Sequence, residues 1–215
     1  MKKLFILSIA LVFFLIGCGK KEEVQTRKTE EQPEQAAKTE TGTATATEKE
    51  AKPISQEPLV RDKNPIVVIE TNYGTIELEL FWKETPKTAE NLLKLTLSGF
   101  YNGLTFHRII PNFVIQGGDP AGNGSGGPGY SIPFEKADTK HLRGSLGMAR
   151  SQDPNSAGSQ FYICLKPLPN LDGNYVVFGK VISGMDAVDK IAAVPTGPGD
   201  MPNEKVIMTK VYEKK

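Results

Sequence analysis

The chain has 215 residues, and its 26 basic and 25 acidic side chains leave a formal net charge of +1 at pH 7. A net charge this small gives no long-range attraction to nucleic acid or to an anionic membrane surface, so we expect no nucleic-acid partner. The length fits one or two domains, and the two cysteines, Cys18 and Cys164, can form at most one disulfide.

Residues 1–17 have the pattern of an export signal. Lys2 and Lys3 precede an apolar run at residues 4–16. As a helix this run spans only about 20 Å, too short for a hydrocarbon core of about 30 Å, whereas a basic start and a short apolar stretch are typical of secretory signals. The ending LIGC (15–18) resembles a bacterial lipobox, which implies cleavage before Cys18, acylation of its thiol and anchoring to a membrane. An ordinary signal peptide with a chance cysteine is the alternative.

Residues 18–64 are expected to be a disordered linker that starts with the lipidated cysteine. Between Gly19 and Pro53 the only large apolar residue is Val24, and the rest is rich in Lys, Glu, Thr and Gln. Such a composition cannot bury enough apolar surface to offset the chain entropy lost on folding. About 45 residues of flexible coil have a typical end-to-end distance of roughly 35–40 Å, so we predict a tether.

Residues 65–215 are predicted to form one globular domain that begins with a β-hairpin. The runs IVVIE (66–70) and TIELELF (75–81) flank the turn residues TNYG. In the second run apolar residues alternate with Glu77 and Glu79, which predicts a strand with one solvated face.

Two helices are expected after that hairpin. The first begins at Thr85-Pro86, because proline is favoured at the first helical position, and ends with Gly99 as its C-cap. The second has a start that resembles a capping box at residues 183–186, SGMD. Short β-rich runs lie between the helices, and KVIMTKVY (205–212) closes the chain. Many short strands with Gly and Pro turns indicate a mostly β domain, either an antiparallel barrel or a sandwich.

The common catalytic and cofactor motifs are missing or lack their context. Residues 122–127 satisfy G-x-G-x-x-G, but prolines follow where a dinucleotide site needs a helix. No serine lies in a G-x-S-x-G elbow. The two histidines, His107 and His141, have no neighbouring ligands at metal-binding spacing, and His107 is expected to be hydrogen-bonded in the core or at its rim. Cys164, inside FYICL, is expected to be a small buried hydrophobe. We therefore expect neither a metal nor a cofactor.

The stretch FHRIIPNFVIQGGDP, which starts at Phe106, places Arg108 and Gln116 among large apolar residues. If the chain is extended there, Phe106 and Arg108 share one face. A bend at residues 111–112 is then needed to bring Phe113 beside Arg108. Spacing alone leaves open whether the polar pair serves a ligand or only satisfies itself in the wall of the domain.

Four motifs in succession resemble the signatures of the cyclophilin family of peptidyl-prolyl isomerases: FHRIIPNFVIQGGD, GNGSGGPG, SLGMARSQDPNSAGSQFYI and LDGNYVVFGKV. The resemblance covers roughly residues 66–212. It implies a closed eight-stranded antiparallel β-barrel with two capping α-helices, and catalysis of cis-trans rotation about X-Pro peptide bonds. A non-catalytic proline-peptide binding module or chaperone on the same fold is the alternative.

The resemblance also implies roles for individual residues. Arg108 matches the catalytic arginine, which would donate to the proline nitrogen as the amide twists, and Phe113 and Gln116 complete the catalytic set. The residues that match substrate-binding positions are His107, Val114, Gly124, Ala149, Arg150, Ser151, Gln160, Tyr162, Asn170, Leu171 and Tyr175. The main chain at 149–151 would bind an extended peptide much as an added strand would.

Four of these positions depart from the family's usual residues, and we expect them to change affinity and sequence preference more than activity. Asn170 replaces a tryptophan, Tyr162 a phenylalanine, Tyr175 a histidine and Arg150 an asparagine. The lost indole predicts weak cyclosporin binding, and the Tyr162 hydroxyl is expected near the ring pocket.

Together these features predict a monomeric, lipid-anchored isomerase outside the cytoplasm. Its expected location is the bacterial cell membrane or the periplasmic side of the outer membrane. The expected partners are proline-containing polypeptides among exported proteins, together with the membrane reached through Cys18.

Overall fold

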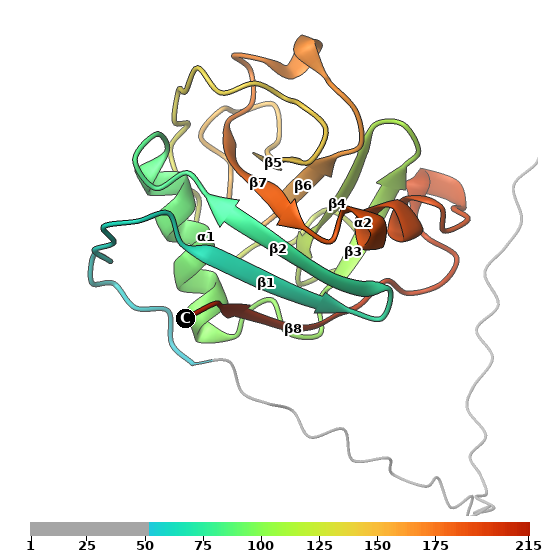
Figure 1. The fold of residues 1–215 in the computed structure, drawn as a ribbon, viewed down its shortest axis with the longest axis horizontal. Helices are drawn as coiled ribbons and strands as arrows, with labels where there is room; N and C mark the ends of the chain where they lie inside the picture. Colours follow the sequence, from blue (N-terminus) through green and yellow to red (C-terminus); the bar gives the residue numbers. More distant parts are fainter. Residues whose placement is uncertain (1–51) are drawn as a thin grey trace, which may run out of the picture. The chain divides into compact units, whose positions relative to one another are not determined.

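The computed structural model describes residues 52–215, so the predicted signal, Cys18 and most of the predicted linker lie outside the described residues. Within that range eight strands form one antiparallel sheet in the order β3-β4-β6-β5-β7-β2-β1-β8 (Figure 1). The strands are β1 (Ile66–Thr71), β2 (Gly74–Leu80), β3 (Thr105–Ile110), β4 (Val114–Asp119), β5 (Ser145–Met148), β6 (Phe161–Cys164), β7 (Val177–Ser183) and β8 (Met208–Glu213).

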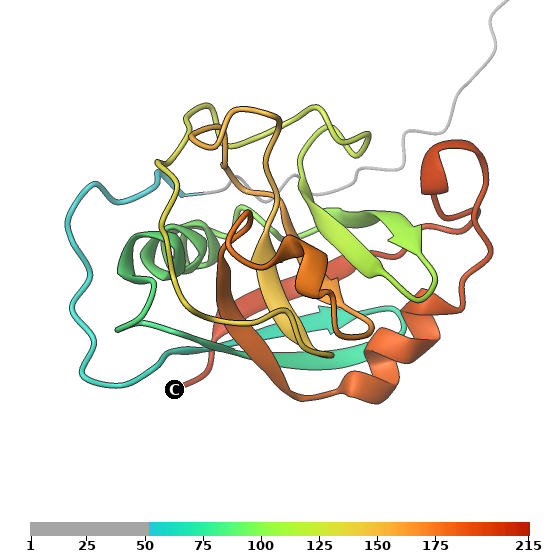
Figure 2. The same ribbon diagram turned by 90° about the horizontal axis from the view of Figure 1, so that it is seen from above.

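The two ends of this sheet approach each other and nearly close it into the predicted barrel (Figures 1 and 2). Thr105 at the start of β3 forms a bridge with Ile207, which directly precedes β8. The Phe106 N–H donates to the Val206 carbonyl over 2.9 Å. Closure of this kind removes the free edge strands that an open sheet would present. The mostly β fold with a nearly closed eight-stranded barrel and two helices is therefore confirmed.

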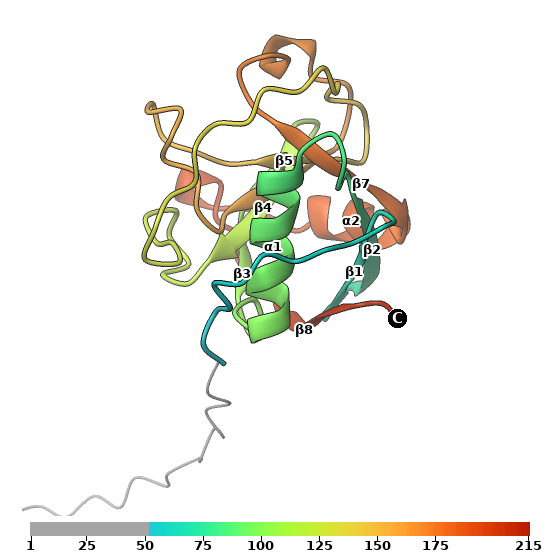
Figure 3. The same ribbon diagram turned by 90° about the vertical axis from the view of Figure 1, so that its left-hand side faces the viewer.

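The helices α1 (Pro86–Ser98) and α2 (Met185–Ala192) lie on opposite sides of the barrel (Figures 1 and 3). As predicted, α1 begins at Pro86 and is capped by Gly99, whose backbone is left-handed with φ of 80°. Ala89, Leu92, Leu93 and Leu95 of this helix are directed into the core, whereas Leu97 is exposed. Within residues 52–215 no helix has the length and apolar character needed to cross a membrane.

The start of α2 differs from the predicted capping box. Gly184 is the N-cap, with φ of 86°, and no side chain caps the helix. Ser183 instead ends β7, so the chain turns sharply between strand and helix. A Cβ at residue 184 would collide with the Thr75 carbonyl oxygen. Only glycine combines this close approach with a left-handed backbone, which is why the serine does not serve as the cap.

Residues 52–64, predicted as the end of the linker, lie against the domain and cross α1 (Figure 3). The Lys52 N–H donates to the Ser98 carbonyl at the end of α1 over 2.9 Å. The Leu59 N–H donates to the Glu90 carboxylate over 2.7 Å. The apolar side chains of Ile54 and Leu59 also pack against the core here. Contacts with the domain therefore begin before the predicted boundary at residue 65.

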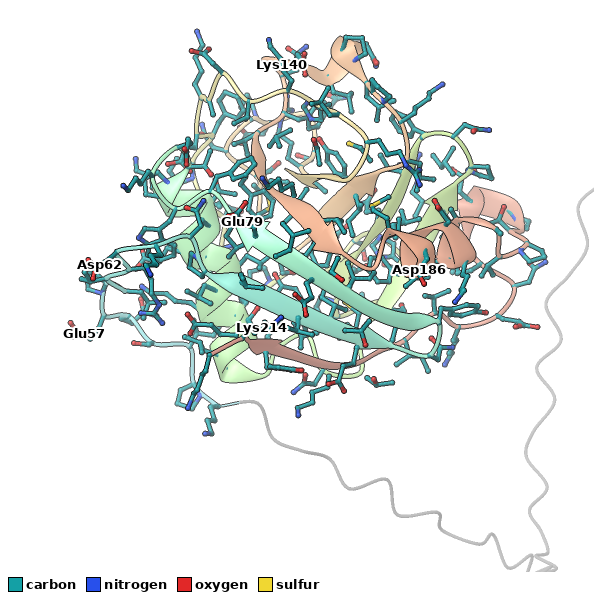
Figure 4. All side chains as sticks on the ribbon, in the orientation of Figure 1. Glu57, Asp62, Glu79, Lys140, Asp186 and Lys214 are labelled. Carbon is teal, nitrogen blue, oxygen red and sulfur yellow. The ribbon has the colours of Figure 1, made fainter. Side chains whose placement is uncertain are left out.

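Charged residues cover the outer face of β2, as its alternating sequence predicts. The apolar residues of the strand are fully buried, whereas Glu77 and Glu79 are partly exposed. Glu77 pairs with Lys214 at 2.7 Å and Glu79 pairs with Lys180 at 3.1 Å; Glu79 and Lys214 are labelled in Figure 4. At this wall, apolar side chains therefore face the barrel interior and charged side chains face the solvent.

Candidate active site

Arg108 and Gln116 face each other across the β3–β4 hairpin. The two residues are register partners. The turn between the strands is residues 111–113, where Asn112 has a left-handed backbone with φ of 59°. This turn is the predicted bend, and it places Phe113 on the same cavity as Arg108. The hairpin therefore brings the three predicted catalytic residues together.

A β-bulge at His107 directs Arg108 outward. The pairing of β3 with β4 shifts between Phe106 and Arg108, which leaves His107 without a register partner. Phe106 and Ile109 are fully buried, whereas the Arg108 side chain is 40% exposed. The prediction that Phe106 and Arg108 share a face is wrong, because the extra residue reverses the alternation. The core keeps the phenylalanine while the arginine reaches the surface.

A cavity of about 220 Å³ opens beside Arg108. It is smaller than the roughly 300–1,000 Å³ of sites for drug-sized ligands, and it suits a single small ring. Every residue that lines it belongs to the predicted site: Arg108, Phe113, Val114, Gln116, Ala149, Arg150, Tyr162, Leu171 and Tyr175. These residues come from β3, β4 and the turn between them, β6, the short 3₁₀-helix η1 (Pro169–Leu171) and the segments after β5 and before β7.

A second cavity, of about 520 Å³, continues from the first. Gln116, Ala149 and Arg150 line both, so the two cavities form one groove. The predicted residues Gly124, Ser151 and Gln160 line the second cavity. Its other lining residues, which the sequence reading missed, are Ser125, Gly126, Gly127, Pro128, Gly129, Tyr130, Ser131, Ser156, Gly158 and Ser159. The signal that could have identified these residues is the dense run of glycines, because glycine lets a ligand approach the main chain closely.

A chain of hydrogen bonds fixes the orientation of Gln116. Its Nε2 donates to Gln160 Oε1 over 3.0 Å. The Gln160 amide donates in turn to the carbonyls of Gly124 and Gly126 over 3.0 and 2.8 Å. The Gln116 Oε1 atom therefore turns toward Arg108, whose Nη1 lies 3.5 Å away. A contact of this length is weak, so Gln116 orients the Arg108 guanidinium and leaves its N–H donors available to a ligand.

The Tyr162 hydroxyl is held behind the cavity wall instead of near the ring pocket, which corrects the expectation. It lies 2.9 Å from His141 Nε2, and His141 Nδ1 lies 2.8 Å from Asp172 Oδ1. Burial raises the pKa of Tyr162. The His141 backbone and ring N–H groups lower the pKa of Asp172, the backbone bond having the larger effect. The tyrosine ring, and not its polar end, therefore forms the wall.

Gly147 lies directly opposite Tyr162 in the β5–β6 pair. A Cβ at residue 147 would collide with Cζ, Cε2 and the hydroxyl oxygen of the Tyr162 ring. A glycine in the middle of a strand often marks such a close approach, and SLGMA carries that signal. The position of the cavity wall thus depends on a residue that does not line the cavity.

Arg150 stiffens the wall next to Tyr175. Its guanidinium lies 4.5 Å from the centre of the Tyr175 ring, within the range of a cation–π contact. It donates to the Asn174 carbonyl over 2.9 Å and to the Ser151 carbonyl over 2.8 Å. The arginine therefore ties together the segments that precede β7 and follow β5.

Two predicted substrate-binding residues, His107 and Asn170, line neither cavity. Asn170 is exposed on η1. His107 is 4% exposed, and among residues 52–215 neither of its ring nitrogens has a hydrogen-bond partner, contrary to expectation. Burial lowers the pKa of His107; nearby Asp119 opposes this shift and Arg108 adds to it. The imidazole is therefore neutral at pH 7.

Cys164 is buried and free. Burial raises the pKa of its thiol to about 12, so the sulfur stays protonated near neutral pH and behaves as the predicted small hydrophobe. Across the described residues, no group of three or more His, Cys, Asp or Glu side chains is arranged to hold a metal ion. The groove offers the guanidinium groups of Arg108 and Arg150, two amide side chains and apolar walls.

Comparison with known proteins places this geometry in context. A family model described as cyclophilin type peptidyl-prolyl cis-trans isomerase/CLD matches residues 66–213. A peptidyl-prolyl cis-trans isomerase of Synechococcus elongatus is 47% identical over 135 residues, which cover 59% of this chain and 92% of the relative. One of Helicobacter pylori is 49% identical over 133 residues, covering 60% and 81%. A crystal structure of a Cryptosporidium parvum cyclophilin-type isomerase in the presence of the dipeptide ala-pro matches with a TM-score of 0.67 and 39% identity, over 70% of this chain and 99% of that one.

Proposed function

The chain belongs to the cyclophilin-type peptidyl-prolyl cis-trans isomerases, and on this premise we propose that it accelerates rotation of X-Pro bonds in exported proteins by stabilising the twisted amide. In this proposal Arg108 donates a hydrogen bond to the proline nitrogen. The protein acts as a monomer and needs no cofactor.

The uncatalysed rotation is slow because amide resonance opposes it. The barrier is about 18–20 kcal/mol, and unaided isomerisation takes tens to hundreds of seconds. As the bond twists, the proline nitrogen regains a lone pair and becomes a hydrogen-bond acceptor. A donor fixed near that nitrogen binds the twisted amide better than either planar form, and this difference in binding lowers the barrier.

The observation that carries the proposal is the position of Arg108 on the cavity walled by Phe113, Tyr162 and Leu171. A proline ring seated between those walls brings its nitrogen toward the guanidinium. Gln116 lies on the same cavity and is held by its own hydrogen bond, so it is placed to contact the substrate carbonyl. The related Cryptosporidium structure was determined with ala-pro, which supports a proline-containing ligand here.

Hydrogen bonding by Arg108 supplies only part of the required stabilisation. A rate acceleration of about 10⁵ needs about 7 kcal/mol. A hydrogen bond to a charged group contributes about 1.5–3 kcal/mol. Positioning of the ring and the partly desolvated groove supply the remainder.

Cis-trans exchange of a short Ala-Pro peptide tests the catalytic proposal against the alternative of a binding module. We expect the purified protein to speed the exchange, measured by NMR, in proportion to its concentration. The rate should be nearly flat from about pH 6 to 8, because the step transfers no proton and His107 has a lowered pKa.

Peptide binding without faster exchange would favour the binding module. A bell-shaped pH profile would indicate general acid–base chemistry.

We propose that acylation of Cys18 tethers the domain to a membrane outside the cytoplasm. The LIGC sequence at residues 15–18 supports this setting. We expect Cys18→Ser to move the protein from the membrane fraction to the soluble fraction of its native host, because the lipid attachment point is lost. Cys164→Ala is the matched control and should stay with the membrane. Unchanged membrane association of Cys18→Ser would contradict the proposal.

A further inference from the structure

A carboxylate from a distant loop contacts the guanidinium of Arg108. Asp200 ends the short 3₁₀-helix η2 (Pro198–Asp200), between α2 and β8. Its Oδ2 accepts a hydrogen bond from Arg108 Nε over 3.2 Å, which is shorter than the 3.5 Å contact with Gln116. The loop that carries η2 lies beside the β3–β4 hairpin (Figures 1 and 2).

The backbone at Asp200 is held in an unfavourable conformation. Among residues 52–215 only Asn112 and Asp200 have positive φ without being glycine, at 59° and 60°. Such a conformation persists only where the surroundings determine it, and it occurs often at functional sites. Here the Gly197 N–H donates to the Met201 carbonyl over 2.8 Å, so the loop closes on itself around Asp200. The Asp200 carboxylate is therefore held by an ordered, hydrogen-bonded turn.

The pair is too exposed for stability to explain it. The side chains of Arg108 and Asp200 are 40% and 45% exposed, and ion pairs with this exposure contribute little to folding. The contact instead fixes the orientation of the Arg108 guanidinium, because this group carries its five N–H donors in one plane. With Nε on Asp200 and Nη1 toward Gln116, the described chain offers no partner to Nη2.

We propose that Asp200 is a positioning residue for the isomerase reaction. It holds Arg108 Nε so that the free end of the guanidinium is directed at the cavity before substrate arrives. This inference rests on the proposed role of Arg108. It assigns part of the catalytic arrangement to a loop 92 positions further along the chain.

The test compares Asp200→Asn with Asp189→Asn in the full chain. Asp189 forms an ion pair with Arg143 at 2.7 Å, with side chains 52% and 46% exposed, away from the groove. We expect Asp200→Asn to lower the exchange rate at saturating peptide by about 10-fold, since small errors in placement are costly to catalysis. Peptide affinity and Tm should stay unchanged. Asp200→Glu, which keeps the carboxylate, should recover part of the rate, and Asp189→Asn should match the wild type.

A second readout does not depend on catalysis. In heteronuclear NMR the Arg108 Nε–H signal should be protected from solvent exchange in the wild type and in Asp189→Asn, and should lose that protection in Asp200→Asn. A wild-type or higher rate for Asp200→Asn, while Arg108→Ala is impaired, would overturn the role of Asp200 and leave the proposed function standing. If Arg108→Ala also retained the full rate, the proposed mechanism through Arg108 would fail, whereas an absence of catalysis in the wild type would overturn the proposed function.

Discussion

Replacing Arg108 by alanine is expected to lower the isomerisation rate constant by about 10- to 150-fold, the equivalent of one charged hydrogen bond of about 1.5–3 kcal/mol. The loss should fall on the rate at saturating peptide and leave peptide affinity almost unchanged, because the proline nitrogen accepts a hydrogen bond only when the amide is twisted. NMR exchange at a series of peptide concentrations separates the two quantities.

Arg108→Lys is the informative control for this variant. Lysine keeps the charge, but its ammonium is a point donor and cannot contact Asp200, Gln116 and the substrate within one plane. We therefore expect an intermediate rate, nearer to alanine than to the wild type. An Arg108→Ala protein with the wild-type rate would contradict the mechanism and would support the reading in which Arg108 and Gln116 only satisfy each other.

Gly147→Ala is expected to reduce isomerisation by about 100-fold or more although residue 147 does not line the cavity. The added methyl would occupy the space of the Tyr162 ring, and displacement of a substrate-positioning wall by about 1 Å can lower rates by that factor. Overpacking of a buried site should also lower the free energy of unfolding by about 1–3 kcal/mol. Unlike Arg108→Ala, this variant should lose peptide affinity as well as rate, as titration with an Ala-Pro peptide would show.

Gly127→Ala provides the matched control for that substitution. Residue 127 lies in the same groove, but a Cβ there meets no atom within 4 Å. Its activity and Tm should stay close to the wild type. Normal peptide affinity in Gly147→Ala would show that the Tyr162 ring can move without loss, and the account of the cavity wall would then be wrong.

The elements with local signals were predictable from the sequence. Pro86 and Gly99 mark the ends of α1 because each is favoured at its position by the backbone alone. The alternation in β2 likewise determines which face is buried. The closed barrel and the grouping of the nine cavity residues came from the family resemblance, since strand order depends on pairing between distant segments.

The features that pattern reading missed depend on contacts with other segments of the chain. The bulge at His107 exists only because β3 pairs with β4 out of step, so the sequence of β3 alone suggested the wrong face for Arg108. Gly184 caps α2 because the Thr75 carbonyl leaves no room for a side chain. In the sequence Asp200 is an ordinary acidic loop residue, and only the fold places it beside Arg108.

The contacts from Asp172 through His141 to Tyr162 join three parts of the chain behind one side of the small cavity: the end of η1, the segment before β5, and β6. Because it is held from three parts of the chain, the Tyr162 wall can move little. An imino acid with a six-membered ring carries one methylene more than proline, and a single methylene in a rigid apolar site is discriminated by about 10- to 200-fold. The wider neighbouring cavity is lined largely by glycine and serine, whose small side chains leave it open to residues of different size. We therefore expect selectivity to differ along the groove, strict for the ring and permissive for the residues around it.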